Sequence, residues 1–450
     1  MQHDQRVFIH AAAYSICQPT TPAADWAAGH VPSFTITRTH TMANTFHRRQ
    51  LLAAGAVAVS TITVESARGY GANDTLNVAC IGTGGRARGT LMPRLAKIPN
   101  VRLAAVCDVW DEHLEKGARL ADSKAIREGS DYRRLLDRSD IDAVLIAAPD
   151  HWHVPMTVDA CKAGKDVYVE KPLTHNLNEG TEVIAAQENL RRIVQVGTQQ
   201  RNIPHLKEAR EVLLSGQLGL IHKIRLSWNR NTAHWKRTRY GIDPGSVRWK
   251  QFLGKAPEQP FDEYRMRNWR WFWDFGGGIF TDLMVHWIDT AYWMLDMDNP
   301  KLAMSIGDQF AASGLWETPD TVQTLLAYPD KKLQAYFEGT FLNHQNRSSL
   351  LFMGTEGNLY CDRGRYEVRP ERGRNVAPRQ RVEGKRDILG LDFYDEVDGA
   401  LYHLREWTNC IRTREKPSCP AEEGVRSAAA AHLANISYRE GKIARWSDVT

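Results

Sequence analysis

The stretch that decides the fold is LNVACIGTGGRA, residues 76–87. Its first half is an unbroken apolar run ending in Gly82, which is typical of a strand buried on both faces of a parallel sheet. Two similar runs, VRLAAVCDV (101–109) and DAVLIAAP (142–149), follow after stretches of helical character. This alternation of strands and helices predicts a doubly wound parallel sheet over residues 77–198.

Beyond residue 200 the pattern changes, because apolar and polar residues now alternate as they do in half-exposed antiparallel strands. Strands of this kind are expected within 220–230, 321–330, 332–342 and 348–362, and helices at 204–215, 279–295, 398–413 and 421–440. We therefore expect residues 199–450 to form an α+β domain with a large, mostly antiparallel sheet. The basic segment 369–387 has no apolar period and is predicted to be a solvated loop, with an interface arm as the alternative.

Composition excludes several classes of protein. A chain of 450 residues is too long for one ordinary core, and its 42% hydrophobic and 25% charged residues are typical of a soluble globular protein. The net charge of +5 is spread without a basic stripe, so a nucleic-acid partner is not expected. Seven cysteines without CxxC pairs do not make a disulfide or zinc framework.

The N-terminal residues 1–76 have the layout of an extension followed by an export signal. The pair Arg48 and Arg49 precedes the apolar run 51–64, which is too short to span a membrane as a mature helix. This layout resembles a twin-arginine (Tat) leader, and Met42 makes a better start than the first methionine. We expect a periplasmic protein without a stable membrane span; a non-cleaved anchor after a disordered tail is the alternative.

The glycine turn after the first strand has the features of a phosphate-binding loop. Gly82, Gly84 and Gly85 allow a sharp turn and a close approach of the backbone to a pyrophosphate. Asp108 ends the next strand, where a carboxylate accepts hydrogen bonds from ribose hydroxyls and repels a 2′-phosphate. The context predicts a Rossmann site that favours NAD, whereas Arg86 and Arg88 keep NADP open. A glycine turn without a ligand is the alternative.

Polar residues follow two neighbouring strands of the predicted sheet. APDHWH (148–153) ends the third strand and EKP (170–172) ends the next, so both lie at the cofactor-facing edge. His151 and His153 could be a metal pair, but no third ligand stands at a suitable spacing, and we expect no metal.

A third set of polar residues lies far downstream. FGGGIFTDLMVHWIDTAYWML (275–295) begins with three glycines and becomes a helix with Asp282 and His286 at positions i and i+4, on one face. The tryptophans Trp269, Trp271 and Trp273 precede it. They fit core packing or the lining of a sugar site, since aromatic faces suit carbohydrate rings.

In combination these motifs resemble those of the Gfo/Idh/MocA (glucose-fructose oxidoreductase / inositol dehydrogenase) family, from about residue 77 to the end. The family's lysine in Glu-Lys-Pro falls on Lys171. Its Pro-Asn-x-x-His element corresponds to residues 149–153, with Asp150 in place of Asn, and its Asp-x-x-x-His pair falls on Asp282 and His286. The tryptophan-rich approach to that pair resembles an exported branch of the family.

The resemblance implies an NAD(P)-dependent oxidoreductase that acts on a sugar or polyol hydroxyl, with a tightly bound cofactor. Lys171, His286 and Asp282 would handle the proton. A lysine is a poor base unless burial or a nearby cation lowers its pKa, so the division of roles between Lys171 and His286 stays open.

The resemblance also implies binding residues and partners. The cofactor set is Gly82, Gly84, Gly85, Arg86, Asp108, Pro149, Asp150, His153, Glu170 and Lys171. The substrate candidates are Trp152, Arg201 and Trp273. A homo-oligomer, dimer or tetramer, is expected. The alternatives are an NAD-dependent glycosidase or lyase that oxidises its sugar transiently, and a non-catalytic sugar or nucleotide sensor.

Overall fold

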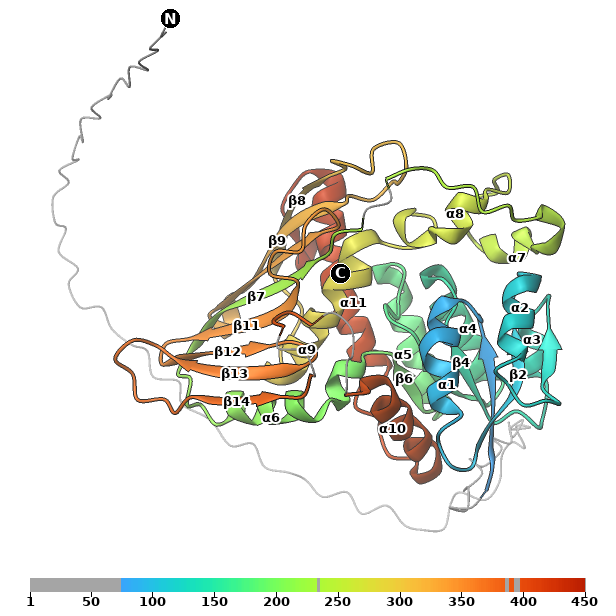
Figure 1. The fold of residues 1–450 in the computed structure, drawn as a ribbon, viewed down its shortest axis with the longest axis horizontal. Coiled ribbons are helices and arrows are strands. Elements are labelled where there is room, and N and C mark those ends of the chain that lie inside the picture. Colours follow the sequence, from blue (N-terminus) through green and yellow to red (C-terminus); the bar gives the residue numbers. More distant parts are fainter. Residues whose placement is uncertain (1–73, 233–234, 385–387, 392–396, 450) are drawn as a thin grey trace, which may run out of the picture. The chain divides into compact units, whose positions relative to one another are not determined.

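The computed structural model describes residues 74–232, 235–384, 388–391 and 397–449, which contain two β-sheets and their helices (Figure 1). The predicted extension and Tat signal fall on residues that lie outside this range, apart from 74–76. Within the described residues, every helix is too short or too polar to cross a membrane.

The first sheet has six parallel strands in the order β3-β2-β1-β4-β5-β6. They are β1 (Leu76–Ile81), β2 (Val101–Cys107), β3 (Ile126–Glu128), β4 (Ala143–Ile146), β5 (Asp166–Val169) and β6 (Val194–Val196). The predicted doubly wound sheet is confirmed. The strand order reverses between β1 and β4, and in such sheets ligands bind beside the carboxyl ends of the strands at that point.

Alternating residues of β1 explain its apolar run. Leu76, Val78 and Cys80 join one hydrophobic core, whereas Ala79 and Ile81 join the core on the opposite face. The helices of this part are α1 (Met92–Leu95), α2 (Asp111–Ala118), α3 (Arg133–Leu136), α4 (Asp150–Lys162) and α5 (Gly180–Asn189). The glycine turn leads into a π-helical segment, η1 (Ala87–Leu91), before α1.

The second sheet has nine strands in the order β14-β13-β12-β11-β7-β10-β9-β8-β15. They are β7 (Ile221–Asn229), β8 (Leu302–Asp308), β9 (Thr321–Tyr328), β10 (Leu333–Thr340), β11 (Ser348–Gly354), β12 (Gly357–Cys361), β13 (Arg365–Pro370), β14 (Arg379–Val382) and β15 (Ala444–Arg445). Only the β7–β10 pair is parallel, so the mostly antiparallel sheet is confirmed among the described strands.

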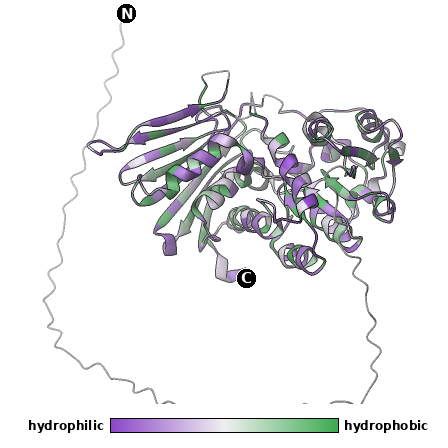
Figure 2. Cartoon of the chain, turned by 90° about the horizontal axis from the view of Figure 1, so that it is seen from below, coloured by the Kyte–Doolittle hydropathy of each residue, from purple (hydrophilic) through white to green (hydrophobic). Residues whose placement is uncertain are grey.

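Helices cover one face of this sheet. They are α6 (Pro204–Leu214), α9 (Val285–Leu295) and α11 (Ala421–Glu440), whose apolar residues share one core with the strands. The other face is open, because Met304, Ile306 and Leu325 point away from that core and are about half exposed. In Figure 2 the strands of this sheet accordingly carry both hydrophobic (green) and hydrophilic (purple) residues.

The prediction of a loop over 369–387 is wrong in part. Within it β14 pairs with β13 and extends the edge of the second sheet. Basic and exposed side chains are common on edge strands, since they discourage pairing with other chains, and they hid the strand from the apolar pattern.

Two segments bring later parts of the chain back to the first sheet. Helix α10 (Gly399–Thr413) places Leu404, Trp407 and Ile411 in the core behind β1. The cap, our name for residues 235–275, contains the short helices α7 (Trp249–Leu253) and α8 (Glu263–Arg267) and lies above the first sheet in Figure 1. Its apolar residues pack around Trp110, which follows β2.

Candidate active site

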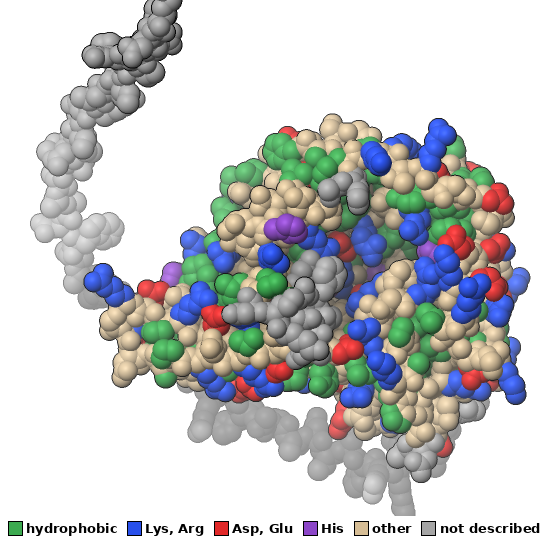
Figure 3. All heavy atoms as spheres, viewed as in Figure 1, with side chains coloured by type: hydrophobic (Ala, Val, Ile, Leu, Met, Phe, Trp, Pro, Cys, Tyr) green, Lys and Arg blue, Asp and Glu red, His purple; other side chains and the backbone are tan. Residues whose placement is uncertain are grey.

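A cavity of about 1090 Å³ lies between the carboxyl ends of the parallel strands, the cap and the second sheet. Figure 3 looks into a hollow where acidic and basic side chains gather. All of the predicted site residues except Arg201 and Trp273 line the cavity: Gly82, Gly84, Gly85, Arg86, Asp108, Pro149, Asp150, Trp152, His153, Glu170, Lys171, Asp282 and His286.

The glycine turn is shaped for a close backbone approach. Gly82 has a φ of +84°, and a Cβ there would lie 2.7 Å from the backbone of Ala147, so only glycine fits. A Cβ on Gly85 would meet nothing within 4 Å, which leaves open space beside the turn. Asp108 fixes the turn, because its carboxylate accepts hydrogen bonds from the backbone N–H groups of Thr83 at 2.7 Å and Trp110 at 3.0 Å.

Lys171 and Asp282 both line the cavity and contact each other. The Lys171 Nζ donates to the backbone oxygen of Asp282 at 2.7 Å and to its Oδ1 at 2.9 Å. Arg270 of the cap donates from Nε to the same Oδ1 at 3.2 Å. Burial raises the pKa of Asp282, but the cations of Lys171 and Arg270 lower it more, so its pKa lies below the usual range. Asp282 is therefore a carboxylate at neutral pH.

His286 occupies the second position of α9. It follows the π-helical segment η6 (Phe280–Met284), which contains Asp282, and both residues face the same cavity as their predicted spacing requires. The Asp282 oxygens bind Lys171 and Arg270 rather than the imidazole of His286. The hypothesis that Asp282 orients His286 through a hydrogen bond therefore finds no such contact among the described residues.

The His286 ring is held as a neutral imidazole. It stacks on Trp228 with 5.0 Å between ring centroids, and its Nδ1 is buried with no hydrogen-bond partner among the described residues. Burial lowers the pKa of His286 well below its usual value, and the nearby cations, Lys171 first, lower it further. A neutral imidazole keeps one unprotonated nitrogen, which can accept a proton.

Glu170 ties the glycine turn to the end of β5. Its Oε1 accepts from Arg86 Nε at 2.8 Å and from Gln199 Nε2 at 3.2 Å. Burial raises the pKa of Glu170, but Arg86 and Lys171 outweigh it and the net pKa is lowered. This ion pair sets the position of the backbone that delivers Lys171.

The first turn of α4 holds two buried predicted residues. Asp150 is 4% exposed, and burial raises its pKa well above the usual value. The His153 ring lies between the backbone oxygens of Pro172 at 2.7 Å and Ala148 at 2.9 Å. His153 thus clamps the segment after Lys171 rather than holding a metal. No group of three His, Cys, Asp or Glu residues in the described part of the chain could hold a metal ion.

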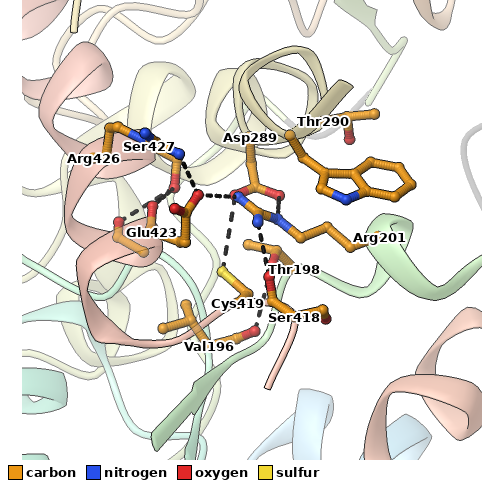
Figure 4. Close-up of polar contacts among 12 residues, drawn as sticks. Val196, Thr198, Arg201, Asp289, Thr290, Ser418, Cys419, Glu423, Arg426 and Ser427 are labelled. Carbon is orange, nitrogen blue, oxygen red and sulfur yellow. Dashed lines mark hydrogen bonds and ion pairs between the residues drawn. The ribbon is translucent and has the colours of Figure 1, made fainter. Parts of the chain in front are cut away.

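Arg201 does not reach the cavity, and its prediction as a substrate residue is wrong. It is 2% exposed and donates from Nε and Nη2 to the two Asp289 oxygens, at 2.9 and 2.8 Å (Figure 4). Its Nη2 also reaches Glu423 at 3.1 Å. Arg201 therefore braces three elements against one another: α9, α11 and η3 (Gln199–Asn202), the segment that follows β6.

Trp273 also lies off the cavity. Its ring contacts Tyr438, with 6.5 Å between ring centroids, and the guanidinium of Arg439 lies 4.9 Å above it. Its neighbours Trp269 and Trp271 line the cavity instead. The sequence shows the tryptophan cluster, but it does not show which of the rings face the cavity, because that depends on the local backbone of the short helical turn Trp269–Trp271.

Comparison with known proteins identifies the family of the chain from two matched stretches. Residues 76–198 match the model of the oxidoreductase family GFO/IDH/MocA, NAD-binding Rossmann fold, and residues 206–360 match the GFO/IDH/MocA C-terminal domain. The uncharacterized oxidoreductase YrbE of Bacillus subtilis (strain 168) is 23% identical over 356 residues, which cover 77% of this chain and 90% of that protein.

Two relatives with assigned activities match over shorter stretches. Inositol 2-dehydrogenase of Rubrobacter xylanophilus is 31% identical over 191 residues, 40% of this chain and 53% of that protein. The α-N-acetylgalactosaminidase of Shewanella oneidensis is 29% identical over 231 residues, 42% of this chain and 50% of that protein. The chain thus spans about half the length of these two relatives.

Solved structures share the fold. Levoglucosan dehydrogenase in complex with NADH and levoglucosan has a TM-score of 0.64 and 18% identity, covering 83% of this chain and 99% of that one. Aldose-aldose oxidoreductase from Caulobacter crescentus has a TM-score of 0.61 and 20% identity, covering 82% and 99%.

Proposed function

Because the chain belongs to the GFO/IDH/MocA oxidoreductase family, we propose that it moves a hydride between a nicotinamide dinucleotide and a carbinol carbon of a sugar or polyol. The observation that carries the proposal is the contact of Lys171 Nζ with Asp282, in a cavity that the glycine turn also lines. Inositol 2-dehydrogenase among the relatives and levoglucosan dehydrogenase among the solved structures support this substrate class.

The residues around the glycine turn fit a dinucleotide. Gly82 has no room for a Cβ, and the space beside Gly85 is open, as the approach of a pyrophosphate requires. Arg86 would face the phosphates and Asp108 the adenosine ribose, which favours NAD over NADP. When bound, the dinucleotide supplies the hydride acceptor. Residues of the cap line the same cavity, which is consistent with a tightly held cofactor.

Different residues of the cavity accept the substrate's proton and stabilise its oxygen. We assign His286 as the base, since it lines the cavity and its ring is neutral. Lys171 donates hydrogen bonds and would stabilise negative charge on the substrate oxygen, and Asp282 holds its Nζ in place. Hydride removal then leaves a carbonyl while the hydroxyl proton goes to His286.

The test is a panel of sugars and polyols with NAD and NADP, followed by the absorbance of the reduced nicotinamide. Lys171→Met should lower kcat by about 10²-fold or more, because a donor aimed at the reacting oxygen is lost. Lys301→Met is the control, since Lys301 precedes β8 of the second sheet and its side chain is 58% exposed. Full turnover in Lys171→Met, or no binding of either dinucleotide, would contradict the proposal.

A second candidate is cleavage of a glycoside by transient oxidation, which the relatives named α-N-acetylgalactosaminidase and glycosyl hydrolase family 109 protein favour. A ring hydroxyl loses a hydride and a proton, the adjacent C–H loses a proton, and the glycosidic substituent leaves. Water then adds and the hydride is returned, so the net reaction is hydrolysis. Release of a phenol from aryl glycosides without net reduction of NAD would identify this route. A non-catalytic sensor would show neither reaction.

We further propose that the protein is exported through the twin-arginine signal, on the basis of the Arg48-Arg49 pair and the apolar run after it. Export suits a cofactor held through folding, because Tat substrates cross the membrane already folded. Cell fractionation of the full chain and of an Arg48→Lys/Arg49→Lys double variant tests this. The double variant should remain in the cytoplasm, and equal export of both forms would contradict the proposal.

A further inference from the structure

Arg270 reaches the cavity from the cap. It is the middle residue of the short helical turn η5 (Trp269–Trp271), and it lines the same cavity as Lys171. Its guanidinium lies 4.2 Å from the centroid of the Trp269 ring, which limits the directions that this long side chain can take. Its backbone has a close neighbour as well, because a Cβ on Gly276 would lie 3.1 Å from the Arg270 Cα.

Arg270 and Lys171 share one carboxylate oxygen. The Arg270 Nε donates to Asp282 Oδ1 at 3.2 Å, and the Lys171 Nζ donates to the same atom at 2.9 Å. The two donors come from different elements, since Lys171 follows β5 and Arg270 belongs to the cap. A carboxylate held by one donor can turn about its terminal bond, whereas two donors on separate elements fix its direction. The flexible Lys171 side chain depends for its position on its contacts with Asp282.

Segments that follow the first sheet anchor the cap on both sides of η5. Before it, the Phe252 backbone oxygen accepts a hydrogen bond from Trp152 Nε1 at 2.9 Å and lies 2.9 Å from His151 Nε2. After it, the Trp273 backbone oxygen lies 3.0 Å from His175 Nε2. His151 and Trp152 begin α4 after β4, and His175 follows β5. The cap is therefore bound to the same strand ends that carry the site.

The second sheet anchors the same turn. Glu317, in the connection between β8 and β9, donates from its backbone N–H to the Trp271 oxygen at 2.9 Å. Its Oε2 accepts from the backbone N–H of Trp273 at 2.9 Å, and the rings of Trp271 and Trp316 stack with 4.6 Å between centroids. These contacts do not involve the Arg270 side chain, so a substitution of Arg270 should leave the cap in place.

We propose that Arg270 is a positioning residue for hydride transfer: it orients the Asp282 carboxylate so that the Lys171 Nζ faces the substrate oxygen. This inference rests on the proposed oxidoreductase function. Because Arg270 acts through Asp282, its loss should slow the chemical step more than it weakens substrate binding. A displacement of a positioned group by about 1 Å can lower a rate by about 10²-fold. The cap then contributes to the reaction itself, in addition to lining the cavity.

The experiment compares Arg270→Ala and Arg270→Lys with the wild type by steady-state kinetics on a sugar or polyol that the wild type oxidises. Arg270→Ala should lower kcat about 10- to 10²-fold and change KM less than about threefold. Arg270→Lys keeps the charge and should retain part of the rate, although a lysine lacks the planar fork of donors. Thermal melting checks that each variant is folded.

Chemical rescue and a matched control locate the effect. The Arg270 side chain is 38% exposed, so a small cation can enter the space that Arg270→Ala leaves. Guanidinium chloride, at concentrations too low to unfold the protein, should therefore restore part of the rate of this variant, whereas sodium chloride should not. Arg237→Ala is the control and should leave both constants unchanged, because Arg237 is a cap arginine that pairs with Asp262 and does not line the cavity.

Crystal structures of the wild type and Arg270→Ala give a readout that does not depend on activity. In the variant, the Asp282 carboxylate or the Lys171 Nζ should move from its position in the wild type. An unmoved pair, an unchanged kcat, or a raised KM with kcat unchanged would each overturn the inference. Equal losses of kcat in the alanine and lysine variants, without rescue by guanidinium, would make Arg270 a structural residue and also overturn it. A wild type that oxidises no sugar or polyol contradicts the proposed function instead, and the crystal structures then decide whether Arg270 positions the pair.

Discussion

The Lys171 Nζ and the Asp282 carboxylate lie 2.9 Å apart although 111 residues separate them in the chain. Strand β5 delivers the lysine from the first sheet, and η6 delivers the carboxylate from the helical layer of the second. Burial costs both charges their hydration, and the contact offsets that cost for each. The two halves of the molecule therefore meet at a pair of groups that can bind a substrate hydroxyl.

Replacement of Asp282 by Asn should lower kcat by about 10²-fold with a smaller change in KM, because Lys171 loses the charge that holds it in place. Steady-state kinetics on an identified substrate measures this. Asp298→Asn is the matched control, since the Asp298 side chain is 94% exposed and should leave both constants unchanged. Equal kinetics of Asp282→Asn and the wild type would remove Asp282 from the mechanism.

The acid limb of the pH profile should lie well below 6.5 if His286 is the base. A base works in its neutral form, so activity is lost as the pH falls through the pKa, and burial with nearby cations lowers the pKa of His286. The measurement is kcat/KM between pH 5 and 9. His286→Gln should lower the rate and abolish that limb. A limb that is unchanged in this variant would assign the titration to another group.

The sequence predicted the centre of the site because each motif follows an element that the apolar pattern identifies. Gly82, Lys171 and the 148–153 turn all follow buried parallel strands, and the carboxyl ends of such strands meet at one edge. Sequence reasoning missed Arg230 and Arg363, which also line the cavity, because no motif of the sequence links them. Their proximity depends on the order of strands in the second sheet, which single strands do not reveal.

Arg201 shows a different limit of sequence reasoning. An arginine after a strand of the first sheet has the same pattern whether it faces a cavity or the interior. What decides is its partners, Asp289 and Glu423, which lie 88 and 222 residues further along the chain. The same holds for the cap, whose helices of five residues are too short for periodicity to reveal.

Breaking the buried ion pair of Arg201 and Asp289 should destabilise the fold. Asp289→Leu leaves the Arg201 charge poorly compensated, which costs about 3–5 kcal/mol, whereas the double variant Arg201→Met/Asp289→Leu should cost less than the sum of Arg201→Met and Asp289→Leu. Urea unfolding measures all four free energies. Strictly additive costs would show that the two side chains do not depend on each other.

Acid should unfold the protein because several buried histidines are neutral. Burial lowers the pKa of His151 and His432 to about 4 from 6.5, so the unfolded state binds their protons first as the pH falls. The free energy of unfolding is therefore unaffected by each histidine above pH 6.5, and it falls as the pH is lowered from 6.5 toward 4. Between pH 7 and 5 the loss is about 2 kcal/mol per histidine.

A variant isolates one of these groups. His151→Phe removes a hydrogen bond to the Phe252 oxygen and should be slightly less stable at pH 7, but it should lose about 2 kcal/mol less on acidification to pH 5. Urea unfolding at the two pH values gives the difference. A loss equal to that of the wild type would place the acid sensitivity elsewhere.

If the protein forms the homo-oligomer that the family resemblance implies, the open face of the second sheet should carry the subunit contact. Met304, Ile306 and Leu325 expose apolar side chains on adjacent strands, and monomers rarely leave such a patch uncovered. Ile306→Lys/Leu325→Lys should therefore lower the molar mass measured by light scattering and leave the fold intact by circular dichroism. Leu120→Lys is the control, because Leu120 is 41% exposed beside the first sheet. An unchanged mass in the double variant would move the contact to another surface, and a monomeric wild type would exclude it.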